Sequence, residues 1–392
     1  MDNKRLFLAF ALSMAIILGF EWLMPKQTPQ QARHQETAAG RAVPGGGTPA
    51  PATDPLTPGA HPAPVASPGP EHRLPIEAPA VYGSINLVGA RLDDLLLHDY
   101  RETVSKGSPN VRVLEARSAK QPNLVQVGWS AAPGTTAALP NDDTLWTADN
   151  ARLTPSQPVT LTWDNGGGLV FSIRIAVDSE YMFDVEQQVR NTTGQPVSLF
   201  PWSRVDRGYT PEVTGGYLVH EGPIAVTNGQ LKEMSYSSVK SGSNKNGGTA
   251  WSSTEEAGAR GGWGGITDKY WLTAVLPDRA ATVTANYRFD SSDGTYQVDF
   301  IPAQAATVPA NGTLSTRAHV FAGAKEVHLL ERYQDRLAVA DFWKAVDFGW
   351  FAFLTRPIFY VLDWLNTVLG NFGLALLAFT LIVKTLFFPL AT

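Results

Sequence analysis

Two long apolar stretches, one near each end of the chain, constrain its fold more than any other feature. Leu6–Leu23 reads LFLAFALSMAIILGFEWL and would span about 27 Å as a helix, close to the hydrocarbon thickness of a bilayer. Phe372–Leu390 reads FGLALLAFTLIVKTLFFPL and has a similar length. We therefore predict a transmembrane anchor at residues 1–24 and a second transmembrane helix at residues 372–392, with everything between them on one side of the membrane.

The charges beside the first stretch indicate its orientation. Lys4 and Arg5 precede it and are expected to stay in the cytoplasm, so the chain would leave the membrane on its outer side. A cleaved signal peptide is the alternative, but such a peptide needs a small-x-small cleavage site, which Trp22–Pro25 does not offer. The sequence favours an uncleaved anchor, and the second helix must then run inward.

Residues 25–75 interleave proline with alanine, glycine and threonine and contain almost no large apolar residue. Such a composition buries too little surface to offset the loss of chain entropy. As a flexible coil the segment would span about 40 Å. We predict a disordered linker that tethers the anchor to a separate domain.

Residues 76–340 consist of short apolar runs separated by turn signals such as Asp293-Gly294. Helical periodicity is confined to Lys325–Leu337, and the Gly-, Ser- and Asn-rich Ser241–Gly265 predicts a long surface loop. Many short strands in succession predict a mainly β fold, one large antiparallel sandwich. The clearest predicted strands are 159–163, 169–177, 182–189, 281–289, 295–301 and 313–321.

Residues 341–371 begin with an aromatic cluster typical of membrane–water interfaces. Arg356-Pro357 then predicts the start of a helix, which Gly370-Asn371 would end. We predict an amphipathic helix on the outer surface of the bilayer, with packing against the β-domain as the alternative. Its apolar face would carry Ile358, Leu362, Leu365 and Leu369, and its polar face Asp363, Asn366 and Thr367.

Composition and motifs argue against several classes of function. The net charge of −5 does not suggest a nucleic-acid partner, and the absence of cysteine excludes disulfides, cysteine-ligated zinc and a thiol nucleophile. No phosphate-binding loop, H-E-x-x-H or G-x-S-x-G motif is present, so we predict neither an enzyme nor a cofactor. Asp184 and Glu186 share one face of a strand, and we interpret them as a solvated pair without a catalytic role. The histidines, none of them at metal-ligand spacing, are His34, His61, His72, His98, His220, His319 and His328.

Lys384 is the one candidate functional residue. It follows Phe372 by twelve residues and would lie about 18 Å into the second transmembrane helix. A charge at that depth is costly unless it faces water or a partner, which makes it a functional candidate. The alternative is that Lys384 only extends its ammonium group to the cytoplasmic headgroups. The residues alone favour neither.

Several blocks resemble the YidC-type membrane protein insertases of the YidC/Oxa/Alb family, in their alphaproteobacterial form. Together they cover the chain apart from the linker, and their order makes chance an unconvincing explanation. The blocks are MDNKRLFLAFALSMAIILGFEWL at residues 1–23, Gly83–Val104, Gly261–Pro277, Leu329–Tyr333, Asp347–Asn366 and Gly370–Leu390.

This resemblance implies a periplasmic β-supersandwich similar to galactose mutarotase folds, followed by a five-helix core that encloses a hydrophilic groove. Lys384 occupies the position of the basic residue in that groove, where the family more often has arginine. The implied function is to assist insertion, folding and assembly of inner-membrane proteins, with nascent membrane proteins, membrane lipids and the Sec translocon as partners. The chain stops at Thr392, soon after the second helix, so we expect an N-terminal part of the insertase.

Two other functions stay open at this point. A membrane-anchored periplasmic carbohydrate-binding or mutarotase-like protein would need a histidine and a carboxylate in one pocket, and His98, His220 and His319 are available for it. A structural adaptor between the inner membrane and envelope partners is the other. Neither requires a lysine inside a transmembrane helix.

Overall fold

The structure is a computed structural model that describes residues 72–211, 219–242, 244–245, 251–349 and 351–391. The chain divides into two compact units, Met1–Ala52 and Thr53–Thr392, and all described residues belong to the second. The predicted anchor and nearly all of the predicted linker lie outside the described residues. The first strand begins at Arg73 and thus includes the last three residues assigned to the linker.

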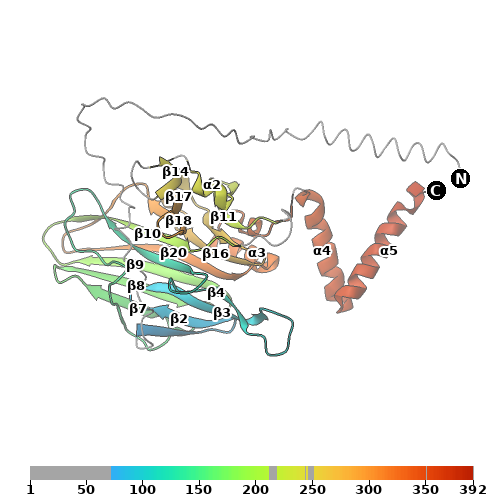
Figure 1. The fold of residues 1–392 in the computed structure, drawn as a ribbon, viewed down its shortest axis with the longest axis horizontal. Helices are drawn as coiled ribbons and strands as arrows, with labels where there is room; N and C mark the ends of the chain where they lie inside the picture. Colours follow the sequence, from blue (N-terminus) through green and yellow to red (C-terminus); the bar gives the residue numbers. More distant parts are fainter. Residues whose placement is uncertain (1–71, 212–218, 243, 246–250, 350, 392) are drawn as a thin grey trace, which may run out of the picture. The chain divides into compact units, whose positions relative to one another are not determined.

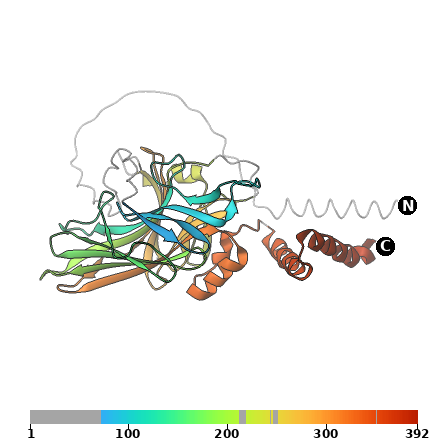
Figure 2. The same cartoon turned by 90° about the horizontal axis from the view of Figure 1, so that it is seen from below.

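The described residues of the second unit form two antiparallel β-sheets, with α3 close to one end of the strands (Figures 1 and 2). The first sheet has the order β1-β2-β3-β5-β10-β18-β17-β14-β13, with β4 paired to β3 and β19 to β10. Its strands are β1 (Arg73–Glu77), β2 (Val81–Asn86), β3 (Arg91–Arg101), β4 (Asn110–Leu114), β5 (Asn123–Ala131), β10 (Val197–Arg207), β13 (Asn244–Lys245), β14 (Trp251–Arg260), β17 (Thr282–Asp290), β18 (Tyr296–Pro302) and β19 (Ala306–Val308).

The second sheet has the order β12-β11-β15-β16-β20-β9-β8-β7-β6. Its strands are β6 (Thr147–Ala148), β7 (Val159–Asp164), β8 (Leu169–Val177), β9 (Met182–Asn191), β11 (Gly222–Thr227), β12 (Gln230–Glu233), β15 (Trp263–Thr267), β16 (Trp271–Pro277) and β20 (Thr313–Ala324). The antiparallel β-sandwich predicted from the sequence is therefore confirmed, and the six predicted strands agree with β7, β8, β9, β17, β18 and β20.

One hydrophobic core lies between the two sheets. Alternation along β8 shows how the sequence builds it, because every second residue from Leu169 to Val177 is buried while the residues between them are not. Phe171 of this strand meets Trp129 of the other sheet edge-on, with ring centroids 5.1 Å apart. Apolar burial on both inner faces holds the sheets together.

The prediction of a long surface loop at Ser241–Gly265 is wrong. The described part of this segment contains β13, β14 and the start of β15, and β14 pairs with β17 along most of its length. Gly265, one of the glycines that suggested a loop, serves a different purpose, because a Cβ there would lie 2.0 Å from the carbonyl oxygen of Thr273 on β16. Glycine here permits close strand approach rather than a turn.

The helices follow the β-domain or interrupt it briefly. They are α2 (Tyr236–Lys240), α3 (Val327–Leu337), the 3₁₀ turn η2 (Phe342–Ala345), α4 (Ala352–Leu369) and α5 (Phe372–Ala391). The predicted helix at Lys325–Leu337 is confirmed as α3. The predicted start at Arg356 is wrong: α4 begins four residues earlier, because the Phe351 carbonyl already accepts hydrogen bonds from Leu354 and Thr355. Gly370, with a left-handed φ of 64°, ends α4 as predicted.

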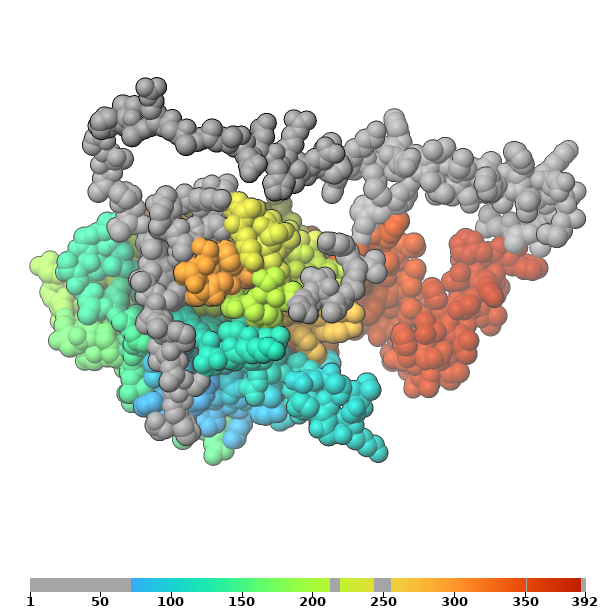
Figure 3. Space-filling model, viewed as in Figure 1, coloured from blue at the N-terminus to red at the C-terminus, as the bar shows by residue number. Residues whose placement is uncertain are grey.

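The loop between β3 and β4 projects from the β-domain (teal in Figure 3), and Val104 within it is fully exposed.

Over the described residues, no helix combines the length and the apolar character that a membrane crossing requires.

Candidate functional site

Lys384, the candidate from the sequence, lies on α5 with an exposed side chain. Among the described residues it has no hydrogen-bond or ion-pair partner. The helix around it presents large apolar side chains to the outside instead of packing them on a core, with Leu377, Leu381 and Leu386 each more than two-thirds exposed. The arrangement therefore offers one unpartnered cation in an apolar helix.

A polar cluster joins α3 to α4. The His328 imidazole lies between two carboxylates, with Nε2 2.9 Å from Asp363 Oδ2 and Nδ1 3.5 Å from Glu331 Oε2. Arg356 donates to Glu331 at 3.0 Å, and the Tyr360 hydroxyl donates to the same carboxylate. Arg356 also donates to the Tyr360 hydroxyl. The hydrogen bonds of Arg356 to Tyr360, first, and to Glu331 raise the pKa of its guanidinium. We call these five residues the α3–α4 clasp.

The clasp bears on the two alternatives for the amphipathic helix. Asp363, expected on the polar face, turns toward α3. Leu365 of the expected apolar face is buried, but it does not belong to the hydrophobic core of the β-domain. A second apolar face, with Phe353, Val361, Trp364 and Val368, is exposed. Helix α4 thus contacts α3 through polar side chains, and it leaves an apolar side uncovered among the described residues.

We predict that Glu331→Ala loosens α4 without unfolding the β-domain. Glu331 accepts from two residues of α4, and a partly exposed network of this kind contributes about 1 kcal/mol, or about a fivefold change in opening. Hydrogen exchange of α4 amides should accelerate by that factor while β-strand amides keep their rates. Arg332→Ala is the matched control, because the Arg332–Glu180 pair at 3.6 Å links α3 to the β-domain only. Equal α4 exchange in both variants would contradict the clasp.

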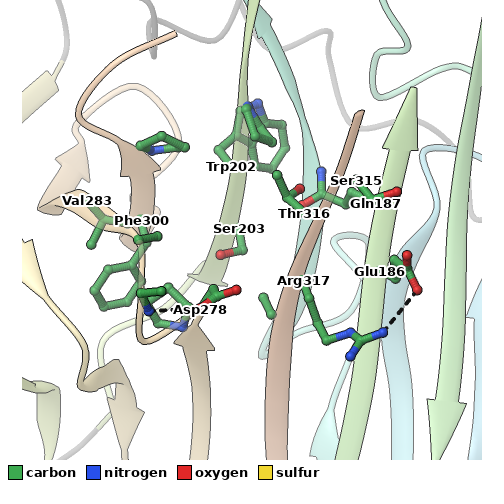
Figure 4. A pocket seen from close by; sticks show the side chains of 16 residues that line it. Glu186, Gln187, Trp202, Ser203, Asp278, Val283, Phe300, Ser315, Thr316 and Arg317 are labelled. Carbon is green, nitrogen blue, oxygen red and sulfur yellow. Dashed lines mark hydrogen bonds and ion pairs between the residues drawn. The ribbon is translucent and has the colours of Figure 1, made fainter. Parts of the chain in front are cut away.

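A cleft of about 500 Å³ opens between the two sheets (Figure 4). Trp202, Ser203 and Phe300 line it from the first sheet. Gln187 and Thr316 line it from the second sheet, together with the end of β16. Gln187 also spans the two sheets, because its amide donates to the Gly128 carbonyl at 2.8 Å. The cleft therefore mixes aromatic faces with polar groups.

The charges beside the cleft lie on neighbouring strands. Arg317 of β20 lies 3.5 Å from Asp184 and 3.3 Å from Glu186 of β9, so the predicted carboxylate pair shares one face and pairs with a cation. His319 lies 3.7 Å from Asp184, and burial lowers the pKa of its imidazole. Asp278 at the end of β16 adds a carboxylate to the rim. Acidic groups thus exceed basic ones here.

No convergent histidine and carboxylate occupy the cleft, which none of the described histidines lines. The His98 ring lies against the Tyr82 ring at a tilt, with centroids 4.5 Å apart, and His220 contacts the Pro223 carbonyl. In the described part of the chain no three His, Asp or Glu side chains are grouped to hold a metal ion.

Sequence reasoning missed the cleft because its residues come from strands far apart in the chain. Trp202 and Phe300 carry no signal by themselves. The sequence signal that could have indicated the cleft is proline within apparent strands, at Pro201 and Pro277. Proline has no backbone N–H, so it marks strand positions that lack a hydrogen-bonded neighbour on one side.

Comparison with known proteins decides the family. Residues 73–361 match the model of the YidC periplasmic domain, which is most of the chain. The chain belongs to the YidC family. It is 48% identical to the membrane protein insertase YidC of Granulibacter bethesdensis, over 100% of this chain and 67% of that protein. It is 38% identical to that of Methylorubrum extorquens, over 100% of this chain and 66% of that protein.

The chain thus spans about two thirds of the length of these YidC relatives, and 54% of the Acidiphilium cryptum insertase to which it is 44% identical. Among solved structures, it is similar to the galactose mutarotase related enzyme of Lactobacillus acidophilus, with a TM-score of 0.42 and 8% identity over 64% of this chain and 97% of that one. At this TM-score and identity, the likeness supports no inference about the function of this chain. The insertase relatives do not favour the mutarotase-like alternative.

Proposed function

We propose that this chain is part of an insertase that assists insertion, folding and assembly of integral proteins in the bacterial inner membrane. One observation carries the proposal: relatives named membrane protein insertase YidC align with the whole chain at up to 48% identity. The incoming nascent membrane proteins would be its substrates, and membrane lipids and the Sec translocon its other partners.

The same proposal assigns a topology. Residues 1–24 would cross the membrane outward and residues 372–392 inward, which leaves the linker and the β-domain in the periplasm. The support is the sequence pattern at both ends, together with the exposed apolar side chains of α5 such as Leu374 and Leu381. The exposed face of α4 with Trp364 and Val368 fits a helix that lies on the outer surface of the bilayer.

Lys384 would supply the attraction for polar parts of an incoming chain. A partly hydrated groove shortens the apolar path that a translocated tail must cross, and a cation within it interacts with acidic groups more strongly than in bulk water. Apolar segments of the substrate would then partition into lipid because their burial there is favourable. Such a mechanism uses charge and hydration alone, with no group-transfer step.

Cysteine labelling tests the topology. The chain has no native cysteine, so Ser156→Cys in the β-domain and Asn3→Cys before the anchor each introduce a single thiol. In intact spheroplasts we expect a membrane-impermeant maleimide to label Ser156→Cys to completion. Asn3→Cys should remain unlabelled until lysis, because Lys4 and Arg5 keep that end in the cytoplasm. The reverse pattern would overturn the proposed topology.

A further inference from the structure

Strand β20 extends beyond the strand that pairs with it on one side. The pairing of β20 with β16 ends at Pro277↔Ala318. After Pro277 the chain leaves β16 and turns toward β17 of the other sheet. The Ala281 N–H bond to the Asp278 carbonyl at 3.0 Å closes that turn. On the opposite side, the pairing of β20 with β9 continues to Thr313. In the described part of the chain, residues 313–317 of β20 therefore have a ladder neighbour on one side only.

The hydrogen-bond register shows which backbone groups face the open side. The Gly312 carbonyl accepts a hydrogen bond from the Asn191 N–H, so this carbonyl faces β9. The Lys325 N–H donates to the Tyr270 carbonyl, so this N–H faces β16. In an antiparallel sheet these directions alternate from residue to residue. Ser315 is three residues after Gly312, so its N–H and C=O point away from β9 and toward the cleft that Ser315 lines. No described backbone group pairs with them there.

Side chains around this edge add a second, independent observation. Thr316 lines the cleft, and its hydroxyl oxygen is buried without a hydrogen-bond partner among the described residues. Trp202 and Phe300 supply aromatic surface in the same cleft (Figure 4). Buried polar groups without partners are costly and uncommon in native proteins. A ligand with both backbone-like polar groups and apolar side chains would satisfy both features.

We propose that the cleft binds an extended segment of another polypeptide, which adds to β20 as an extra strand beside Ser315. Unpaired N–H and C=O groups at a sheet edge recognise an extended backbone in this manner, and adjacent pockets select alternate side chains. The open residues 313–317 span about 17 Å. The carboxylates of Glu186 and Asp278 beside one cation, Arg317, select a neutral to basic segment. The binding does not depend on Lys384 or on insertion.

Fluorescence anisotropy with the purified full-length protein in detergent tests the proposal. The probe is a fluorescein-labelled heptapeptide, Lys-Thr-Val-Thr-Val-Thr-Lys, which is basic at its ends and prone to extend. The matched probe carries N-methyl groups on residues two to seven, which removes the N–H groups of both strand edges and leaves every side chain in place. We expect saturable binding of the first probe and at least tenfold weaker binding of the second.

Variants of the protein place the binding at β20. Ser315→Pro removes the backbone N–H that faces the cleft and should weaken binding at least tenfold, whereas Ser315→Ala keeps it and should change binding less than twofold. If Ser315→Pro does not fold, the two probes still decide the question. Equal binding of the methylated and unmethylated probes, or no binding at 1 mM peptide, would refute the proposal.

Discussion

Arg207→Met should destabilise the β-domain by about 3–5 kcal/mol, the largest effect we expect from a single substitution outside the hydrophobic core. Arg207 is 1% exposed and holds Asp268 through two hydrogen bonds, of 2.5 and 2.8 Å. It also donates to the Tyr236 hydroxyl at 3.0 Å. Burial opposes its charge, yet the Asp268 carboxylate holds the pKa of Arg207 well above its ordinary value. Its loss would leave Asp268 without its cation.

Urea unfolding followed by tryptophan fluorescence measures this effect. Arg152→Met is the matched control, because the Arg152–Glu77 pair has a similar distance of 2.9 Å but both side chains are more than half exposed. That control should stay within about 0.5 kcal/mol of the parent protein. Adding Asp268→Leu to Arg207→Met should recover part of the loss, since no unpaired charge then remains. Similar losses for Arg207→Met and Arg152→Met would show that burial does not decide the strength of this pair.

Reversing the charge of Lys384 should abolish most insertion of substrates with acidic translocated tails. If the cation acts from a partly hydrated groove, Lys384→Arg should keep at least half of the activity, because either cation supplies the attraction. Lys384→Ala should lose most activity and Lys384→Glu nearly all of it, with small effects on neutral tails. Lys269→Ala, which removes an exposed lysine of the β-domain, is the control and should be silent. If Lys384 only extends its ammonium group to the cytoplasmic headgroups, Lys384→Ala would have no effect on insertion either.

Local pattern predicted the elements of this fold well where alternation and turn chemistry agreed. The period-two burial of β8 and the left-handed Gly370 were both readable from the residues themselves. The failures came where tertiary contacts override local preference. Gly265 contributed to the prediction of a loop, but it permits the close approach of β16. Helix α4 begins before Arg356, because backbone bonds to Phe351 start the helix earlier than proline suggested.

One part of the candidate site could be predicted from the sequence and the other parts could not. Lys384 could be singled out because a lysine in an apolar run is visible in the sequence alone. The cleft could not, because the open backbone of Ser315 depends on where β16 ends, and Trp202 and Phe300 reach the cleft from different strands. The α3–α4 clasp was equally hidden: Asp363 was assigned to a solvent-facing side, and only the packing of α4 against α3 shows its contact with His328.

Protease protection of a reporter tail is the measurement that tests the central claim most directly. Cells depleted of their own insertase would express the full-length protein with Lys, Arg, Ala or Glu at position 384, together with a small membrane protein whose acidic tail must reach the periplasm. We expect external protease to digest the tail in the Lys and Arg strains, to digest little in the Ala strain and to digest almost none in the Glu strain. Equal digestion in all four strains would contradict a role for Lys384, and no digestion in the Lys strain would contradict the proposed function itself.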